Sequence, residues 1–205
     1  MSRTSLTESP EVLATKSRIA ASTLKEVRKH GILGLRLADV AEGANVSIPL
    51  IYKYFDDRDG LLAAVLGEII ERHFDEELDG IHQLMEMLSK STKLEDIAAL
   101  MPKPGDTWRR ERRWLRVEAK AAAREIPALR AQIATAMANV EQATTLLIEK
   151  ARSISGNQSK VPARTIAWMI IAFSDGFTNN DLAKDPITDA EYEPLIRDLL
   201  ASHVF

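Results

Sequence analysis

A short stretch of the chain, residues 47–58, places hydrogen-bond donors next to apolar side chains. Six side chains in or before this stretch could donate to phosphate oxygens: Lys16, Arg36, Ser47, Lys53, Tyr54 and Arg58. Such groups contact the sugar-phosphate backbone in proteins that bind nucleic acid. A helix that begins near Arg58 would add backbone N–H groups and a dipole that favours an anion. These residues therefore indicate a phosphate-binding surface, and the alternative is an ordinary solvated one.

The apolar residues of the same stretch have a different chemistry. The candidates for contact with base edges are Ile48, Pro49, Leu50 and Tyr52. Aliphatic side chains neither donate nor accept hydrogen bonds, but they pack against the C5-methyl group of thymine in the major groove. Ile51 and Phe55 have the spacing of an inward-facing pair, so Leu50 points elsewhere. The alternative is that Ile48 and Leu50 pack inward as additional core.

Three helices are predicted in the first sixty residues, over residues 12–30, 37–44 and 48–55. Gly31 follows the first helix as a C′ residue, and Asn45 tolerates a left-handed turn after the second. Ser47 is predicted to cap the third helix, and Pro49 lies in its first turn, where a missing N–H leaves no intrahelical bond unmade. Two short helices joined by a tight turn predict a helix-turn-helix, whose second helix commonly lies in the DNA major groove.

The residues of this segment follow one family's pattern in order and spacing, without a gap. The matching residues are Lys16, Ile19, Gly31, Val40-Ala41, Ala44-Asn45-Val46-Ser47, Ile51-Tyr52-Lys53-Tyr54-Phe55, and Arg58 before Leu61-Leu62. On these residues, the segment 16–62 resembles the DNA-binding domain of TetR-family transcriptional regulators. The resemblance implies a sequence-specific DNA-binding regulator, expected to be a repressor that a small-molecule effector releases from its operator.

Several positions depart from the family's usual pattern. Arg36 stands where a Thr or Ser usually caps the second helix, and it adds a cation that could reach a phosphate. Asn45 replaces the usual turn glycine. Ile48 and Pro49 replace a Lys or Arg and a Gly at the start of the third helix. We therefore expect this surface to recognise methyl groups and shape more than hydrogen-bonding base edges.

The remaining residues carry helical patterns and no strand pattern, so the predicted fold class is all-α. The helix expected from Arg58 has an apolar side made of Leu61, Leu62, Val65, Leu66, Ile69, Ile70 and Phe74. Further helices are predicted near 81–88, 94–101, 107–124, 127–155, 162–183 and 189–202. We expect three parts: a flexible arm over residues 1–11, the helix-turn-helix domain over 12–57, and a helical effector-binding and dimerisation domain over 58–205.

A homodimer is expected because one helix-turn-helix head recognises only half of a palindromic operator. The segment 166–173 is apolar nearly all round its helix, and the last helix has an apolar stripe. In the TetR family the corresponding helices of two subunits form a four-helix interface. By this resemblance the interface residues are Trp168, Ile171, Phe173, Leu195 and Leu199. The alternative is a helix buried within its own chain.

Candidate effector contacts lie in the middle helices, where family members commonly hold a small molecule. They are His82, Met85, Met101, Trp108, Trp114 and Glu118. Methionine and tryptophan suit a partly apolar ligand, and His82 and Glu118 could anchor its polar groups. The alternative is ordinary core packing. The cluster RRERR at 109–113 is expected to solvate a helix face and to pair with neighbouring acids.

Composition and motifs narrow the function classes. The chain has no cysteine, which excludes disulfides and thiolate zinc sites. It has no nucleophile elbow, glycine-rich phosphate loop or paired-histidine spacing, so we expect no enzyme activity, cofactor or metal. Its longest strongly apolar run is far shorter than the roughly 20 residues of a membrane span, so we expect a cytoplasmic protein with no membrane partner. The near-neutral first sixty residues leave one alternative open, a helical protein-interaction module without specific DNA binding.

Overall fold

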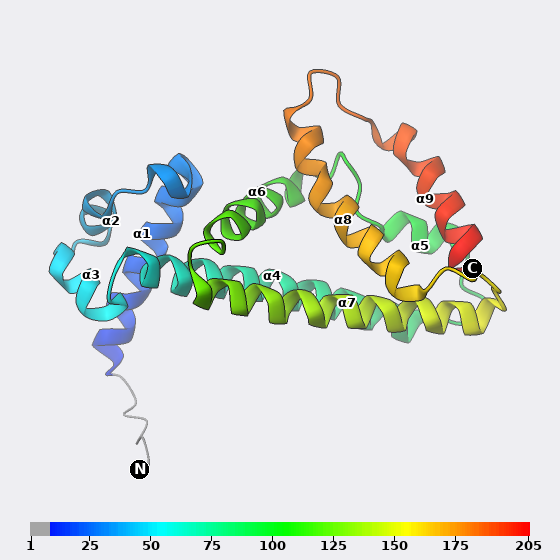
Figure 1. Cartoon of the computed structure of the whole chain (residues 1–205), viewed down its shortest axis with the longest axis horizontal. Helices are drawn as coiled ribbons and strands as arrows, with labels where there is room; N and C mark the ends of the chain where they lie inside the picture. The colour runs from blue at the N-terminus through cyan, green and yellow to red at the C-terminus, as the bar shows by residue number, and fades with distance from the viewer. Residues whose placement is uncertain (1–8) are drawn as a thin grey trace, which may run out of the picture. The chain divides into compact units, whose positions relative to one another are not determined.

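The computed structural model describes residues 9–205 and contains nine α-helices and no strand within them (Figure 1). The all-α prediction is therefore confirmed. Residues 1–8 of the predicted arm lie outside the described residues, whereas Pro10 and Glu11 already belong to the first helix. No helix in the described part of the chain is long and apolar enough to span a lipid bilayer.

The chain divides into two compact units. The first comprises residues up to 69 together with 118–131, and the second comprises 70–117 together with 132–205. The predicted boundary after residue 57 is a functional division, and it stays a prediction. The first unit is larger than that division because it also includes the beginning of the long fourth helix and residues 118–131.

The first unit contains α1 (Pro10–Gly34), α2 (Leu37–Ala44), α3 (Ile48–Phe55) and the first part of α4 (Arg58–Met87). Its core is made of fully buried aliphatic side chains: Ile19, Val40, Ile51, Leu61, Leu62 and Leu66. The Ser22 hydroxyl donates to the Val40 carbonyl at 3.0 Å, which joins α1 to α2. At Gly43 a Cβ atom would lie 2.4 Å from that hydroxyl, so close packing of the two helices requires glycine there.

The predicted turns are present, with one correction. Gly31 interrupts α1 with φ 68° and ψ 172°, and Asn45 ends α2 in the left-handed conformation with φ 53° and ψ 53°. Ser47 stands at the N-cap position of α3 with extended backbone, but its hydroxyl makes no capping hydrogen bond. The predicted side-chain cap was therefore wrong, and α3 begins with Pro49 in its first turn instead.

The second unit contains the rest of α4, α5 (Leu94–Leu100), most of α6 (Thr107–Ala122) and α7 (Pro127–Ser155), α8 (Ala163–Leu182) and α9 (Asp189–His203). The separate helix predicted near residues 81–88 was wrong, because α4 continues without a break to Met87. Gly80, just before the predicted segment, costs about 1 kcal/mol relative to alanine. This cost is too small to end a helix that packs along its length. The loops at 102–105, 155–160 and 184–186 were predicted correctly in position.

The core of the second unit joins its last two helices to its middle ones. Fully or nearly buried members include Ile97 on α5, Ile148 on α7, Ile166 on α8 and Leu200 on α9. The Phe177 and Tyr192 rings meet edge to face at 5.1 Å, which fixes α8 against α9. Thr188 caps α9 by accepting from the Glu191 N–H, while the Glu191 carboxylate accepts the Thr188 N–H in return.

Candidate DNA-binding surface and ligand cavity

The predicted base-reading residues divide by exposure along α3. Pro49 and Tyr52 are exposed, Ile48 and Leu50 are partly buried, and Ile51 is fully buried as the helical phase predicted. Partial burial of Ile48 and Leu50 means that each packs on its own unit and still presents surface to solvent. The exposed side of α3 is therefore mostly apolar, in keeping with its sequence.

The Tyr54 ring gathers two of the predicted phosphate-binding cations. The Lys16 Nζ atom lies 5.8 Å from the centre of the ring and the Lys53 Nζ atom lies 5.9 Å from it. Lys16 comes from α1, whereas Lys53 and Tyr54 are on α3. Cation–π attraction of this kind holds ammonium groups near an aromatic face while leaving their N–H donors able to bind anions. The structure thus brings these three predicted residues together beside the exposed side of α3.

The other predicted phosphate ligands are placed differently. Arg36 and Ser47 are exposed at the positions that precede α2 and α3. Arg58 donates to the Ile32 carbonyl at 2.6 Å, so its guanidinium ties the start of α4 to the end of α1. At the start of α4 the Asp57 carboxylate already accepts the Gly60 N–H at 2.7 Å. The helix start that was expected to attract a phosphate thus carries an anion of the chain's own.

Glu118, predicted as an effector anchor, belongs to the first unit. Its carboxylate accepts the backbone N–H of Ile32 at 2.9 Å. The backbone angles at Gly31 favour glycine, and a Cβ atom there would lie 2.9 Å from the same carboxylate, which would have to shift. The two residues that meet here are 86 positions apart, and no local pattern in the sequence signals the contact.

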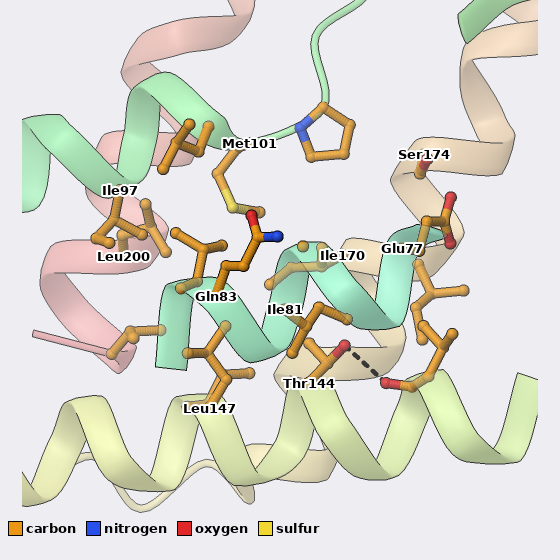
Figure 2. Close-up of a pocket in the computed structure, with 18 of the residues that line it drawn as sticks. Glu77, Ile81, Gln83, Ile97, Met101, Thr144, Leu147, Ile170, Ser174 and Leu200 are labelled. Atoms are coloured by element: carbon orange, nitrogen blue, oxygen red, sulfur yellow. Dashed lines mark hydrogen bonds between the residues drawn. The ribbon is translucent and has the colours of Figure 1, made fainter. Parts of the chain in front are cut away.

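A cavity of about 460 Å³ lies within the second unit (Figure 2). Residues of α4 to α9 form its wall, and most of them are apolar. Figure 2 shows Ile97 and Leu200 toward one side of the cavity, with Glu77 and Ser174 on the other. The hydroxyl group of Thr144, also in the wall, donates a hydrogen bond to the Val140 carbonyl at 2.8 Å. Its oxygen can therefore only accept a hydrogen bond from a ligand.

The charged residues of the cavity wall form what we call its polar end: Glu76, Glu77, Arg109, Arg112 and Arg116. Arg116 binds Glu77 through two hydrogen bonds of 2.5 and 3.2 Å, and Arg112 pairs with Glu76. Arg116 is only 6% exposed. Within the predicted cluster at 109–113, Arg113 is only 2% exposed and pairs with Asp181. The prediction that this cluster solvates a helix face was therefore wrong for Arg113, although pairing with acids was predicted correctly.

Two donors at the polar end make no hydrogen bond within the described residues. The Nε atoms of Arg109 and Arg116 are buried without a hydrogen-bond partner in the described residues. Burial lowers the pKa of Arg109, an effect that Asp106 opposes. Beside them, burial and the neighbouring Arg112 and Arg116 lower the pKa of His73 to about 4, so this histidine is neutral at pH 7 and adds no charge.

The predicted effector residues meet only in part. Met101 and Trp108 line the cavity, whereas His82, Met85, Trp114 and Glu118 are not among its lining residues. His82 is exposed, and the Met85 carbonyl accepts a hydrogen bond from Lys150. Most of the wall was missed because it combines residues from helices far apart in the sequence, among them Ile81, Thr144, Leu147 and Ile170. Each of these has the spacing of an ordinary core residue.

The predicted dimer residues also differ in placement. Trp168 on α8 and Leu195 on α9 are exposed large hydrophobic side chains. Leu199 is buried in the core of its own chain, Phe173 packs against that core, and Ile171 lines the cavity. Trp168 and Leu195 thus present apolar surface on α8 and α9, and the interface itself stays a prediction.

Known proteins resemble the helix-turn-helix segment of this chain in sequence. Residues 19–65 match the sequence model described as "Bacterial regulatory proteins, tetR family". The "HTH-type transcriptional regulator BetI" of Burkholderia thailandensis is 34% identical over 55 residues, which are 27% of this chain and 28% of that relative. The match thus spans little more than a quarter of the relative's length.

Solved structures extend the likeness in fold to nearly the whole chain. A transcriptional regulator from Saccharomonospora viridis, solved in complex with choline, has a TM-score of 0.72 at 16% identity and covers 92% of this chain and 96% of its own. A regulator from Pseudomonas aeruginosa PAO1 has a TM-score of 0.69 at 15% identity, with 95% and 91% covered. Residues 19–65 are thus similar in sequence to the DNA-binding segment of TetR-family regulators, and nearly the whole chain shares the fold of these solved regulators.

Proposed function

We propose that the protein is a homodimeric repressor that binds a palindromic operator through α2 and α3 and is released when a small molecule occupies the cavity of the second unit. The observation that carries the proposal is the grouping of Lys16, Lys53 and Tyr54 beside the exposed side of α3. In this proposal the three side chains contact phosphates, while Pro49, Tyr52 and the exposed parts of Ile48 and Leu50 contact base edges.

Dimerisation through α8 and α9 is part of the proposal, because one head reads only one half-site. Two heads must lie about one helical turn of DNA apart, roughly 34 Å, or a multiple of that distance. The exposed Trp168 and Leu195 support α8 and α9 as the interface, because large exposed hydrophobic side chains on adjacent helices mark association surfaces.

Effector binding in the cavity is supported by its size and composition. Small-molecule sites commonly measure about 300 to 1,000 Å³ and combine apolar walls with a few polar groups, as the 460 Å³ cavity does. Helix α6 contributes Arg109, Arg112 and Arg116 to the cavity wall and Glu118 to the contact with Ile32. A displacement of this helix by a ligand would therefore act on the first unit through the Glu118–Ile32 hydrogen bond.

The proposal is tested by gel shift with the DNA that flanks the protein's own gene. Tyr54→Phe removes only the hydroxyl, and Lys53→Ala removes one ammonium group. We expect Lys53→Ala to weaken binding across sequences and to lower the salt dependence by about one phosphate contact. Lys90→Ala, an exposed lysine in the second unit, is the matched control. Absence of any specific shift at moderate salt would favour the helical protein-interaction module instead.

A further inference from the structure

Both carboxylates at the polar end of the cavity are already paired. Glu77 receives two hydrogen bonds from Arg116, and Glu76 pairs with Arg112. An ionised carboxylate that holds a guanidinium in this way presents little net charge to a ligand. Two acidic residues line the polar end, but neither carboxylate is free to bind a cationic ligand.

Arg109 is the charged residue of the polar end whose partner lies outside the cavity wall. Asp106 is 3.3 Å from its Nε atom, yet the geometry makes no hydrogen bond, and Asp106 already accepts the Lys103 N–H at 3.0 Å. The buried Nε atom of Arg116 is also without an acceptor. Buried donors that make no hydrogen bond are rare and costly, so a ligand that supplies an acceptor to these two N–H groups would be favoured.

Trp108, an aromatic residue of the cavity wall next to the polar end, already contacts two arginines of the same chain. The Arg109 guanidinium lies 4.5 Å from the centre of the Trp108 ring and the Arg112 guanidinium lies 5.5 Å from it. A quaternary ammonium ligand is usually bound by several aromatic faces. Here the Trp108 ring already has two guanidinium groups close to its centre, and these would repel a further cation.

The rest of the cavity suits an apolar body. Ile81, Ile97, Leu147 and Leu200 line it, and Figure 2 shows Ile97 and Leu200 on the opposite side from Glu77. From these contacts we infer that the effector is an amphipathic anion, with an elongated apolar body among the aliphatic residues and one carboxylate bound at Arg109. This inference rests on the proposed function, because it takes the cavity to be the effector site.

The test compares three probes of equal chain length with the full-length protein by calorimetric titration, below their micellar concentrations. The probes are dodecanoate, 1-dodecanol and dodecyltrimethylammonium. We expect dodecanoate to bind at least about tenfold more tightly than the alcohol, because a hydrogen bond to a charged group outweighs a neutral one. The trimethylammonium probe is expected to bind more weakly than the alcohol.

Variants then assign the preference to Arg109. Arg109→Gln should reduce dodecanoate affinity about tenfold and leave 1-dodecanol within about twofold, while Arg109→Lys should retain most of the preference. Arg110→Gln is the matched control, because this neighbour on α6 loses the same charge but does not line the cavity. Unchanged alcohol binding by Arg109→Gln also shows that the cavity is intact in that variant.

Three results overturn the inference: equal binding of the three probes, preference for the trimethylammonium probe, or no binding of any probe. Gel shifts with the same preparations keep this failure distinct from failure of the proposed function. If the protein binds DNA specifically but does not bind dodecanoate, the inference of an anionic effector is wrong and the proposed regulatory function stands. If the protein binds dodecanoate through Arg109 but does not bind DNA, the proposed regulatory function is wrong and the inference of an anionic ligand stands.

Discussion

Among single residues of the second unit, two arginine–carboxylate ion pairs differ in how far the arginine side chain is buried. Arg113 donates to Asp181 at 3.0 Å with its side chain only 3% exposed, whereas Arg164 donates to Glu141 at the same distance with its side chain 68% exposed. A buried ion pair that loses one partner leaves an uncompensated charge in a low-dielectric site. An exposed pair leaves a group that water can solvate.

This difference predicts unequal effects of one substitution. Arg113→Met should lower the free energy of unfolding by about 3 kcal/mol, because Asp181 stays buried and keeps only the exposed Arg110, 3.6 Å away, as a cation. Arg164→Met, the matched control, should cost less than about 1 kcal/mol. Urea denaturation of the two variants measures both values. Equal losses would show that burial of the Arg113–Asp181 pair does not set its contribution.

The residues of α3 predict an unusual dependence on thymine. Pro49 is exposed and Leu50 partly so, and neither side chain can hydrogen-bond to a base edge. Replacing contacted operator thymines by uracil removes only the C5-methyl groups and should weaken binding by about 1 kcal/mol per contacted methyl. Fluorescence anisotropy with the two duplexes measures the change. Indifference to the exchange at every operator thymine would refute methyl recognition.

At the scale of elements, the end of α1 depends on glycine at position 31. Its φ of 68° with ψ of 172° lies in a region that only glycine adopts readily, and the Glu118 carboxylate closes the space where a Cβ atom would lie. Gly156 also has positive φ, 78°, but nothing lies within 4 Å of a Cβ atom there.

Alanine at these two glycines should therefore have different effects. We expect Gly31→Ala to cost about 2 to 3 kcal/mol of unfolding free energy, from backbone strain together with the displaced Glu118. Gly156→Ala should cost about 1 kcal/mol, from strain alone. Thermal unfolding of both variants checks the order, and a larger loss at Gly156 would contradict the role assigned to the Glu118 contact.

The elements that could be predicted from the sequence are those fixed by local rules. Asn45 in its left-handed turn, Pro49 in a first turn and Ile51 facing inward follow from neighbouring residues alone. The unbroken length of α4 did not follow, because packing over the whole helix outweighs the polar stretch around Gly80.

The residues of a candidate site could be predicted only where a local sequence pattern places them. Lys16, Lys53 and Tyr54 were found through a helical motif, and they meet in the structure. The roles of Arg58 and Glu118 depend on Ile32, which is distant from both in the sequence. The same holds for the cavity wall, whose residues look like core residues until the helices are brought together.

For the whole molecule, the proposed function requires two copies of the chain. Leu195 is 52% exposed on α9, in the proposed interface, and Leu146 is 48% exposed on α7. Leu195→Arg should convert the dimer to monomer and weaken operator binding by at least tenfold, because a single head binds one half-site. Leu146→Arg is the control. Analytical ultracentrifugation checks the state, and a Leu195→Arg protein that remains dimeric would contradict the interface.

A competition experiment at physiological salt tests whether α3 reads DNA sequence. The wild-type protein is bound to labelled DNA that flanks its own gene, and the complex is challenged with the same DNA unlabelled or with a duplex of scrambled sequence. A sequence-specific regulator should prefer its own site by about a thousandfold or more. Equal displacement by the two competitors would contradict the assignment of α3 as a sequence-reading helix.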